Sequence, residues 1–265
     1  MSSAISIYAY NLAVVLVLMV FLWGFSLIKK DASIADIYWG LGFVIVAWIT
    51  GIRVEGFDWR KITVLFFVSI WGLRLAFHIG WRSWGKEEDR RYQKWRQEYG
   101  DRFWWVSLFL VFGLQGVLLW VISLVVQAAL VSDLPDHLVW LDGVGILLWS
   151  TGFLFEAVGD WQLARFKADP DNSGKVMDRG LWAYTRHPNY FGECLIWWGI
   201  FCLAVTAPKN FWTIVSPITI TFLLLRVSGV TLLEKDIAER RPEYREYIGT
   251  TSAFIPWFRK KDTRS

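Results

Sequence analysis

Residues 179–199 read RGLWAYTRHPNYFGECLIWWG, a polar segment that leads directly into an apolar run. Pro188 suits the first position of a helix, which leaves unpaired N–H groups and the positive end of the helix dipole beside Arg186 and His187. Such a helix start binds anions. Glu193 lies more than one turn inside the run, and a carboxylate within a membrane span is costly unless it has a partner or a function. Taken singly, Arg186 and His187 are interpreted as interfacial anchors and Asn189 as a helix-start residue. Together with Glu193 they favour a membrane helix whose polar start forms part of a binding site.

The composition of the whole chain indicates a membrane protein. Of its 265 residues 55% are hydrophobic and 19 are Trp, and the mean hydropathy is +0.35. A soluble domain would have to expose much of that surface to water. A helix of about 20 apolar residues crosses a bilayer. Seven such runs occur, near 8–28, 34–52, 62–81, 104–131, 138–159, 189–207 and 211–230. The sequence predicts an all-α, polytopic membrane helix bundle with about seven transmembrane helices.

The basic residues predict the orientation of this bundle. Of the 28 Lys and Arg residues, Arg74 and Arg226 lie inside predicted spans. If the spans alternate strictly, four of the others fall on one side and the remaining 22 on the opposite side. The positive-inside rule makes the side with 22 cytoplasmic. The N-terminus is then outside and the C-terminus cytoplasmic. The first run is expected to be retained, because no basic segment precedes it and no small-residue cleavage site follows.

The chain is expected to form a single membrane domain, 1–265. Its first part, 1–131, supplies the helices on the substrate side, and 138–258 forms the half that binds a cofactor. Cys194 and Cys202 fall in one predicted helix and are interpreted as packing residues, so neither a disulfide nor a metal site is expected. No GxGxxG or GxxxxGK[ST] motif occurs in the sequence, which argues against a Rossmann or P-loop nucleotide site.

Charged residues recur at the predicted cytoplasmic ends of the last three spans. They are Glu156, Asp160, Arg165, Lys167, Arg186, Glu193, Arg226 and Glu234. One interpretation is a set of internal ion pairs. The other is a ligand that is charged in one part and rich in hydroxyl groups in another, as a dinucleotide is, since Arg and Lys bind phosphates and carboxylates bind ribose hydroxyls.

The N-terminal half offers further polar candidates. Arg74, His78 and Arg82 follow at four-residue intervals, and His78 is either a proton donor or a hydrogen-bonded structural residue. Asp36 completes a possible capping box with Ser33 at the start of the second span, or else faces a cavity. Tyr38 is either an interfacial aromatic residue or a hydrogen-bond donor in that cavity.

At this point the sequence resembles a known family. The stretch from Arg179 to Glu193 and the tail that runs through Arg241-Pro242-Glu243-Tyr244-Arg245-Glu246-Tyr247 to Phe254-Ile255-Pro256 resemble the DUF1295 group of steroid 5α-reductase-like membrane proteins. The likeness is specific over roughly 150–258. In the N-terminal half its best landmark is Asp36-x-x-Trp39-Gly40. The wider superfamily includes sterol reductases, which use NADPH, and isoprenylcysteine carboxyl methyltransferases, which use S-adenosylmethionine.

The resemblance implies a cofactor site in the C-terminal half. The reductase-like features are Asp160 and Asn189-x-x-Gly192-Glu193, and they favour NADPH. The expected cofactor-binding residues are Glu156, Asp160, Arg165, Lys167, Lys175, Arg179, Tyr184, Arg186, His187, Asn189, Tyr190, Glu193, Arg226 and Glu234.

The resemblance also implies an NADPH-dependent reductase that transfers hydride to a polarised carbon–carbon double bond of a lipophilic substrate arriving from the bilayer. Tyr38, Asp36 and His78, in that order, are the candidate catalytic donors to the conjugated oxygen. Steroid reductases bind the substrate carbonyl with a Glu and Tyr pair. The stretch Ser69-Ile70-Trp71-Gly72-Leu73-Arg74, which contains no Tyr, stands where that Tyr is expected. The expected substrate is a steroid-like molecule or another lipid, and the missing pair argues against a steroid enone.

Two other functions stay open from the sequence. Arg-His-Pro-x-Tyr and a tail of similar type also occur in the methyltransferases, so an S-adenosylmethionine-dependent enzyme is one alternative. The other is a non-enzymatic membrane transporter or scaffold whose charges pair only with each other. The expected location is the bacterial inner membrane, with the cofactor site facing the cytoplasm. The expected partners are lipids and a lipophilic small molecule, not nucleic acid.

Overall fold

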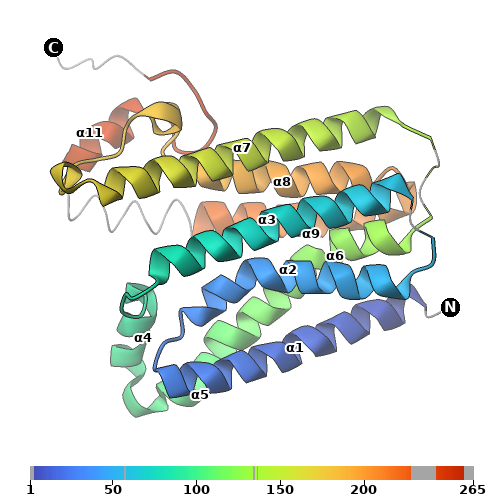
Figure 1. Ribbon diagram of the computed structural model, residues 1–265, viewed down its shortest axis with the longest axis horizontal. Coiled ribbons are helices and arrows are strands. Elements are labelled where there is room, and N and C mark those ends of the chain that lie inside the picture. Colours follow the sequence, from blue (N-terminus) through green and yellow to red (C-terminus); the bar gives the residue numbers. More distant parts are fainter. Residues whose placement is uncertain (1–2, 57, 134, 136, 228–242, 260–265) are drawn as a thin grey trace. The chain divides into compact units, whose positions relative to one another are not determined.

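The computed structural model describes residues 3–56, 58–133, 135, 137–227 and 243–259, and every regular element within them is helical. Figure 1 shows the helices along the chain. Their bounds are α1 Ala4–Lys29, α2 Ile34–Arg53, α3 Trp59–Ser83, α4 Arg90–Tyr99, α5 Phe103–Ser107, α6 Leu114–Val131, α7 Trp140–Ala168, α8 Pro188–Ala204, α9 Val215–Phe222 and α11 Glu243–Thr250. Shorter 3₁₀ turns are η1 Gly100–Arg102, η3 Pro170–Asn172, η4 Gly180–Ala183 and η5 Pro208–Ile214, and two π-helical segments are η2 Leu108–Gly113 and η6 Leu223–Val227.

The helices confirm the predicted membrane class. In the described part of the chain, six helical stretches are long and apolar enough to cross a bilayer. They are α1, α2, α3, the run Arg90–Val131, α7 and the run Pro208–Val227. The sixth predicted span is the apolar helix α8, whose 17 residues lie at the lower limit for crossing. The number of seven spans and the orientation stay predictions.

Two predicted spans are interrupted where the sequence reads as one apolar run. The run from 104 contains the π-helical segment Leu108–Gly113 before α6 begins. The described part of the last run, 211–227, lies in η5, α9 and a second π-helical segment. A π-turn inserts one residue into the helical ladder and changes which side chains share a face. Hydropathy does not detect this change, because every residue of the first π-segment is apolar or glycine.

The chain divides into two compact units. The first contains Met1–Leu138 and Leu203–Ser216, and the second contains Val139–Cys202 and Pro217–Ser265. All the predicted catalytic donors belong to the first unit. The predicted cofactor residues that the structure describes all belong to the second.

Close backbone approach holds α2 against α3 in the first unit. A Cβ added at Gly40 would lie 2.4 Å from the carbonyl oxygen of Gly72, and one added at Gly72 would lie 2.5 Å from that of Gly40. Small residues at such crossings let membrane helices pack tightly. Next to this contact the rings of Phe43 and Trp71 meet edge-on, 5.5 Å apart.

An uncharged polar network joins α1, α2 and α6 inside the same unit. The side-chain amide of Asn11 donates to Thr50 Oγ1 at 2.8 Å and to Gln127 Oε1 at 2.9 Å, and Gln127 in turn donates to Ser123 Oγ at 2.9 Å. All four side chains are buried. Buried polar groups that pair with one another fix the register of apolar helices, which otherwise have no directional contacts.

Candidate functional site

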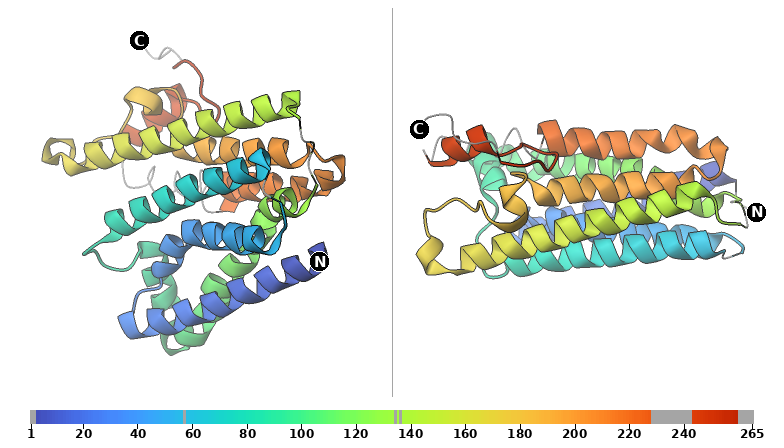
Figure 2. Two further views of the ribbon diagram at one scale, coloured as in Figure 1. Left: turned by 45° about the vertical axis from the view of Figure 1, so that its right-hand side comes forward. Right: turned by 90° about the horizontal axis from the view of Figure 1, so that it is seen from above.

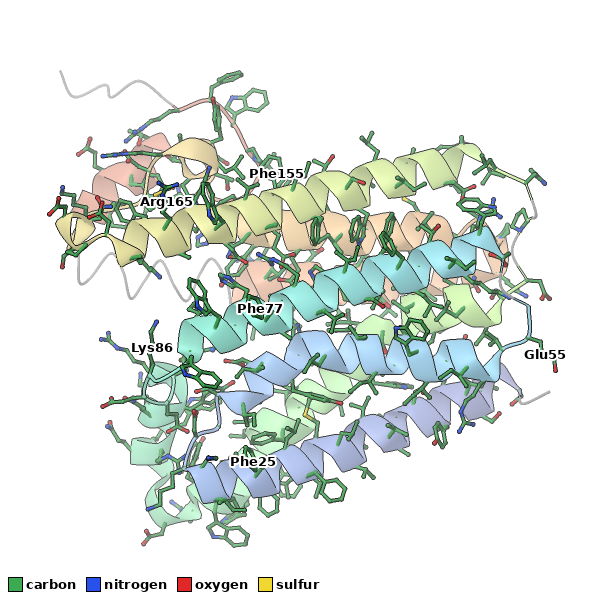
Figure 3. All side chains as sticks on the ribbon, in the orientation of Figure 1. Phe25, Glu55, Phe77, Lys86, Phe155 and Arg165 are labelled. Atoms are coloured by element: carbon green, nitrogen blue, oxygen red, sulfur yellow. The ribbon has the colours of Figure 1, made fainter. Side chains whose placement is uncertain are left out.

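Glycines spaced seven residues apart bring α7 and α8 together in the second unit. Gly145, Gly152 and Gly159 recur on α7, and Gly192 and Gly199 recur on α8. A Cβ at Gly152 would lie 2.5 Å from the Gly192 carbonyl oxygen, and a Cβ at Gly199 would lie 2.7 Å from that of Gly145. The views in Figures 1 and 2 agree that the two helices run side by side. Figure 3 labels Phe155 of α7, whose ring meets Phe191 of α8 edge-on at 5.2 Å.

This packing places the predicted acidic residues near the start of α8. A Cβ at Gly192 would lie 3.0 Å from Glu156 Cβ. Glu156 on α7 therefore faces α8 at Gly192, the residue directly before Glu193. Glu156 and Glu193 are only 2% and 9% exposed. One turn further along α7, Gly159 packs on Pro188 and on the backbone of Asn189.

Asp160 and Asn189, two of the expected cofactor-binding residues, contact each other in the structure. Asn189 Nδ2 donates to Asp160 Oδ1 at 3.1 Å, and Asp160 is 7% exposed. Within the described part of the chain, Asn189 Oδ1 is buried and has no hydrogen-bond partner. A buried polar atom without a partner is costly in a folded protein and is often satisfied by a ligand or by water. The pair therefore offers an unused acceptor next to a carboxylate.

A tight turn positions the residues that precede α8. Gly180 has φ +60°, and an added Cβ would lie 2.4 Å from the amide of Gln162, so the turn needs glycine. The N–H of Leu181 donates to Gln162 Oε1 at 3.0 Å, and the indole N–H of Trp182 donates to the carbonyl oxygen of Gly159 at 3.0 Å. These bonds fasten the turn Gly180–Ala183 to the end of α7.

A cavity of about 320 Å³ lies beside this turn. Two predicted cofactor residues, Arg165 and Arg179, line it together with Gln162, Asp169 and Gly180. Figure 3 labels Arg165 on α7. Both arginines are exposed, and the guanidinium of Arg165 lies 5.6 Å from the ring of Trp161. The cavity thus presents two cations to an anionic group.

Arg186 and His187 are buried and already make contacts within the protein. The guanidinium of Arg186 donates through one nitrogen to the carbonyl oxygens of Ile248, at 3.0 Å, and Thr251. These carbonyls lie at the C-terminal end of α11, where a cation is favoured. The ring of His187 stacks on that of Tyr190, with centroids 5.4 Å apart and planes 3° apart. Arg186 therefore anchors the tail, whatever other contact it makes.

The remaining predicted cofactor residues lie on the surface of the second unit or outside the described residues. Lys167 and Lys175 are exposed, and Tyr184 is 46% exposed with its ring against Phe258. Arg226 is exposed on the π-helical segment Leu223–Val227. Glu234 lies outside the residues that the structure describes.

In the first unit, Asp36 is the centre of a hydrogen-bonded cluster. Its Oδ2 pairs with the guanidinium of Arg91 at 2.7 Å, and its Oδ1 accepts from Tyr92 Oη at 2.7 Å and from Gln115 Nε2 at 3.3 Å. Gln115 also donates to Tyr92 Oη at 3.1 Å. Asp36 is therefore engaged by α4 and α6.

The capping box considered for Ser33 and Asp36 is wrong. The hydroxyl of Ser33 accepts from the N–H of Asp89 at 2.8 Å and caps nothing in α2. Burial alone would raise the pKa of Asp89, but hydrogen bonds from Arg91 outweigh it and lower that pKa below its ordinary value. The segment before α4 thus fastens to the start of α2.

Tyr38 and His78 lie on neighbouring helices of the first unit. Tyr38 is 7% exposed, and its Oη has no hydrogen-bond partner among the described residues. Its ring packs against Gly42, where an added Cβ would lie 3.0 Å from it and 2.3 Å from Leu119. His78 is partly exposed on α3. Tyr38 is thus a predicted donor whose hydroxyl makes no hydrogen bond among the described residues.

The sequence analysis missed Tyr92, Arg91, Gln115 and Gln162. The first two lie on α4, which is a short polar helix that hydropathy leaves out. An available signal was Asp89 followed by a ten-residue amphipathic segment, which is a helix start with a carboxylate cap. Nothing local marks Gln115 or Gln162, because their partners are distant in the sequence.

The comparisons with known proteins confirm the DUF1295 part of the resemblance. The family profile described as "Protein of unknown function (DUF1295)" matches residues 22–251. An uncharacterized protein of Schizosaccharomyces pombe is 25% identical over 269 aligned residues, covering 89% of this chain and 75% of the relative. No solved structure matches the chain. Since the profile covers most of its length, the chain belongs to the DUF1295 family.

Proposed function

We propose that this protein is an NADPH-dependent membrane reductase that transfers hydride to a polarised carbon–carbon double bond of a lipophilic substrate. The observation that carries the proposal is the buried Asp160–Asn189 pair with its unused Asn189 Oδ1, next to the start of α8. The same pair belongs to the stretch that resembles the reductases.

The residues near this pair fit the chemistry of a dinucleotide. The carboxylate of Asp160 accepts hydrogen bonds from ribose hydroxyls, and the Asn189 amide oxygen accepts one more. Arg165 and Arg179 are exposed around one cavity and bind phosphate oxygens. The cavity of about 320 Å³ lies at the lower end of the range for small-molecule sites, so it suits the phosphate part of the cofactor and not the whole.

The start of α8 adds a further contribution. Pro188 opens the helix, and the N–H of Phe191 donates to the carbonyl oxygen of His187 at 3.0 Å. The first turn of an α-helix is its positive end, because the helix dipole points that way. A phosphate or a polarised carbonyl of the cofactor is stabilised at this position.

NADPH, when bound, supplies the hydride. On the protein side, a hydrogen-bond donor must stabilise the negative charge that develops on the conjugated oxygen of the substrate. Tyr38 is the preferred donor because its buried Oη has no partner in the described structure, whereas Asp36 already binds three side chains. With the hydride on the β-carbon, a proton taken from solvent water at the α-carbon would complete the reduction.

Cofactor-dependent stabilisation of the purified protein tests the proposal. A ligand that binds the folded state raises its stability, so NADPH is expected to raise the unfolding temperature. Asp160→Ala and Asn189→Ala should each reduce that shift, while Asp171→Ala, an exposed acidic residue of the same unit, should not. If NADPH gives no shift, or if both site variants respond as the wild type does, the proposal fails.

One observation favours a second candidate, an S-adenosylmethionine-dependent methyltransferase acting on a lipophilic thiol or carboxylate. The ordered segment Arg186–Tyr190, with His187 stacked on Tyr190, is the part of the resemblance that these enzymes share. Stabilisation by S-adenosylmethionine and not by NADPH would select it.

A further inference from the structure

A second cavity, of about 330 Å³, lies where the end of α11 meets the last described residues of the chain. Apart from Arg186, none of its lining residues was expected to form part of a site. The lining residues are Arg186, Ile248, Gly249, Thr250, Thr251, Ser252, Ala253, Trp257 and Phe258. All of them belong to the second unit.

Backbone hydrogen bonds hold the walls of this cavity in place. The N–H of Arg186 donates to the carbonyl oxygen of Ser252 at 2.9 Å, and the N–H of Trp257 donates to that of Tyr184 at 2.9 Å. Between them, Thr185 Oγ1 donates to the carbonyl oxygen of Phe254 at 2.9 Å. The tail therefore pairs with the segment before α8, and the cavity is preformed.

Tyr247 strengthens the same connection. Its buried Oη donates to the carbonyl oxygen of Trp182, and burial raises the pKa of this phenol, so that it stays protonated as a donor. Thus α11 is tied to the turn Gly180–Ala183 as well as to Arg186.

One of the residues that line the cavity has a polar atom without a hydrogen bond. Thr251 is 3% exposed, and within the described part of the chain its Oγ1 is buried without a hydrogen-bond partner. The neighbouring Thr250 Oγ1 accepts from Arg259 Nε at 3.2 Å and donates to backbone carbonyls of its own helix, so it is already satisfied. Thr251 is thus a lining residue whose hydroxyl makes no hydrogen bond among the described residues.

Two aromatic residues, Trp257 and Phe258, also line the cavity. Trp257 and Phe258 are 68% and 75% exposed, and their rings lie 6.4 Å apart at 71°. Flat aromatic faces of this kind bind planar heterocycles by stacking, and an arginine guanidinium does the same. A planar ring with hydrogen-bonding atoms on its edge matches both the aromatic wall and the threonine hydroxyl.

The electrostatics favour a neutral ring over a phosphate. The cavity lies at the C-terminal end of α11, where the helix dipole is negative. Its guanidinium, Arg186, is already bound to two carbonyl oxygens there, and none of the lining residues is acidic. Phosphates are better served by the first cavity, which has two exposed arginines.

We propose that this second cavity binds the purine ring of an adenine nucleotide, with Thr251 hydrogen-bonded to the edge of the base and Trp257 stacked on its face. The inference deepens the proposed function and rests on it for the identity of the cofactor. Adenine occurs in NADPH and in S-adenosylmethionine alike, so the site itself does not depend on which of the two binds.

The test measures binding of three probes to the purified full-length protein: NADPH, adenosine, and reduced nicotinamide mononucleotide, which lacks the adenine. Thr251→Val removes the hydroxyl with little change of volume, and Trp257→Ala removes the stacking face. Trp140→Ala is the matched control, because Trp140 is 75% exposed at the start of α7. Unfolding temperatures of all variants establish that they are folded.

We expect both cavity variants to weaken adenosine and NADPH binding by about tenfold or more and to leave reduced nicotinamide mononucleotide unchanged. If they bind NADPH as the wild type does, the purine site is overturned while the proposed function stands. If adenosine binds and the variants lose it, but NADPH does not bind, the purine site stands and the reductase falls. The Trp fluorescence that is lost in Trp257→Ala reports on Trp257. If brominated lipids quench this fluorescence and adenosine does not, the aromatic pair is a membrane anchor and the purine site is overturned.

Discussion

Replacing Gly192 with Ala should separate α7 from α8 and disturb the candidate site. The new Cβ would lie 2.4 Å from the carbonyl oxygen of Gly152 and 2.5 Å from the N–H nitrogen of Glu156. Both are backbone atoms, so no side-chain rotation relieves the clash and the helices must move apart. Overpacking of this kind typically costs about 1–3 kcal/mol.

Gly143→Ala is the matched control on α7. A Cβ at Gly143 meets nothing within 4 Å, and Ala is a better helix former than Gly by roughly 0.5–1 kcal/mol. The control should therefore be as stable as the wild type or more so. Because Glu156 and Asp160 face α8 across the same contact, Gly192→Ala should also weaken NADPH binding.

The assay is thermal or denaturant unfolding in detergent micelles, followed by NADPH titration of the folded variants. Equal stability of Gly192→Ala and Gly143→Ala would refute the packing argument. A destabilised Gly192→Ala variant with unchanged NADPH affinity would refute the link between the glycine contact and the site.

Two further predictions concern buried tyrosines. Tyr92→Phe removes a hydroxyl that donates to Asp36 at 2.7 Å, so it should lower the free energy of unfolding by about 1–3 kcal/mol. The control Tyr99→Phe, on the same helix, should have little effect. Equal effects of the two substitutions would contradict the role of the Asp36 cluster. The pKa of Tyr247 is raised, so its contribution to stability should be complete below about pH 10, the ordinary tyrosine value, and be lost as the pH rises through the folded-state pKa. Unfolding curves of the wild type and Tyr247→Phe should therefore differ at neutral pH and converge at high pH, and a constant difference would contradict the assignment.

Much of the fold could be predicted from the sequence, because hydropathy over long runs leaves few alternatives. The predicted runs 8–28, 34–52 and 62–81 fall within α1, α2 and α3, and 189–207 overlaps α8. The π-helical segments could not be predicted in this way, since their geometry depends on packing. At Gly113 an added Cβ would lie 3.0 Å from the Leu108 carbonyl oxygen, a contact that is visible only in the structure.

The candidate site was partly predictable for a similar reason. Residues four apart on one helix, such as Glu156 and Asp160, could be placed on a common face from spacing alone. The resemblance named Asp160 and Asn189 separately, and their hydrogen bond is visible only in the structure, where glycine contacts bring α7 and α8 together. The role of Arg186 could not be foreseen, because its carbonyl partners lie more than 60 residues away in the sequence.

The central claim is that the second unit holds an NADPH molecule around Asp160, Asn189 and the two arginines of the first cavity. Native mass spectrometry of the protein, purified in mild detergent and incubated with NADPH and S-adenosylmethionine together, tests this claim most directly. One bound NADPH is expected in the wild type, and a much smaller bound fraction is expected in the Asn189→Ala variant. Bound S-adenosylmethionine in place of NADPH, or equal NADPH occupancy in the two proteins, would contradict it.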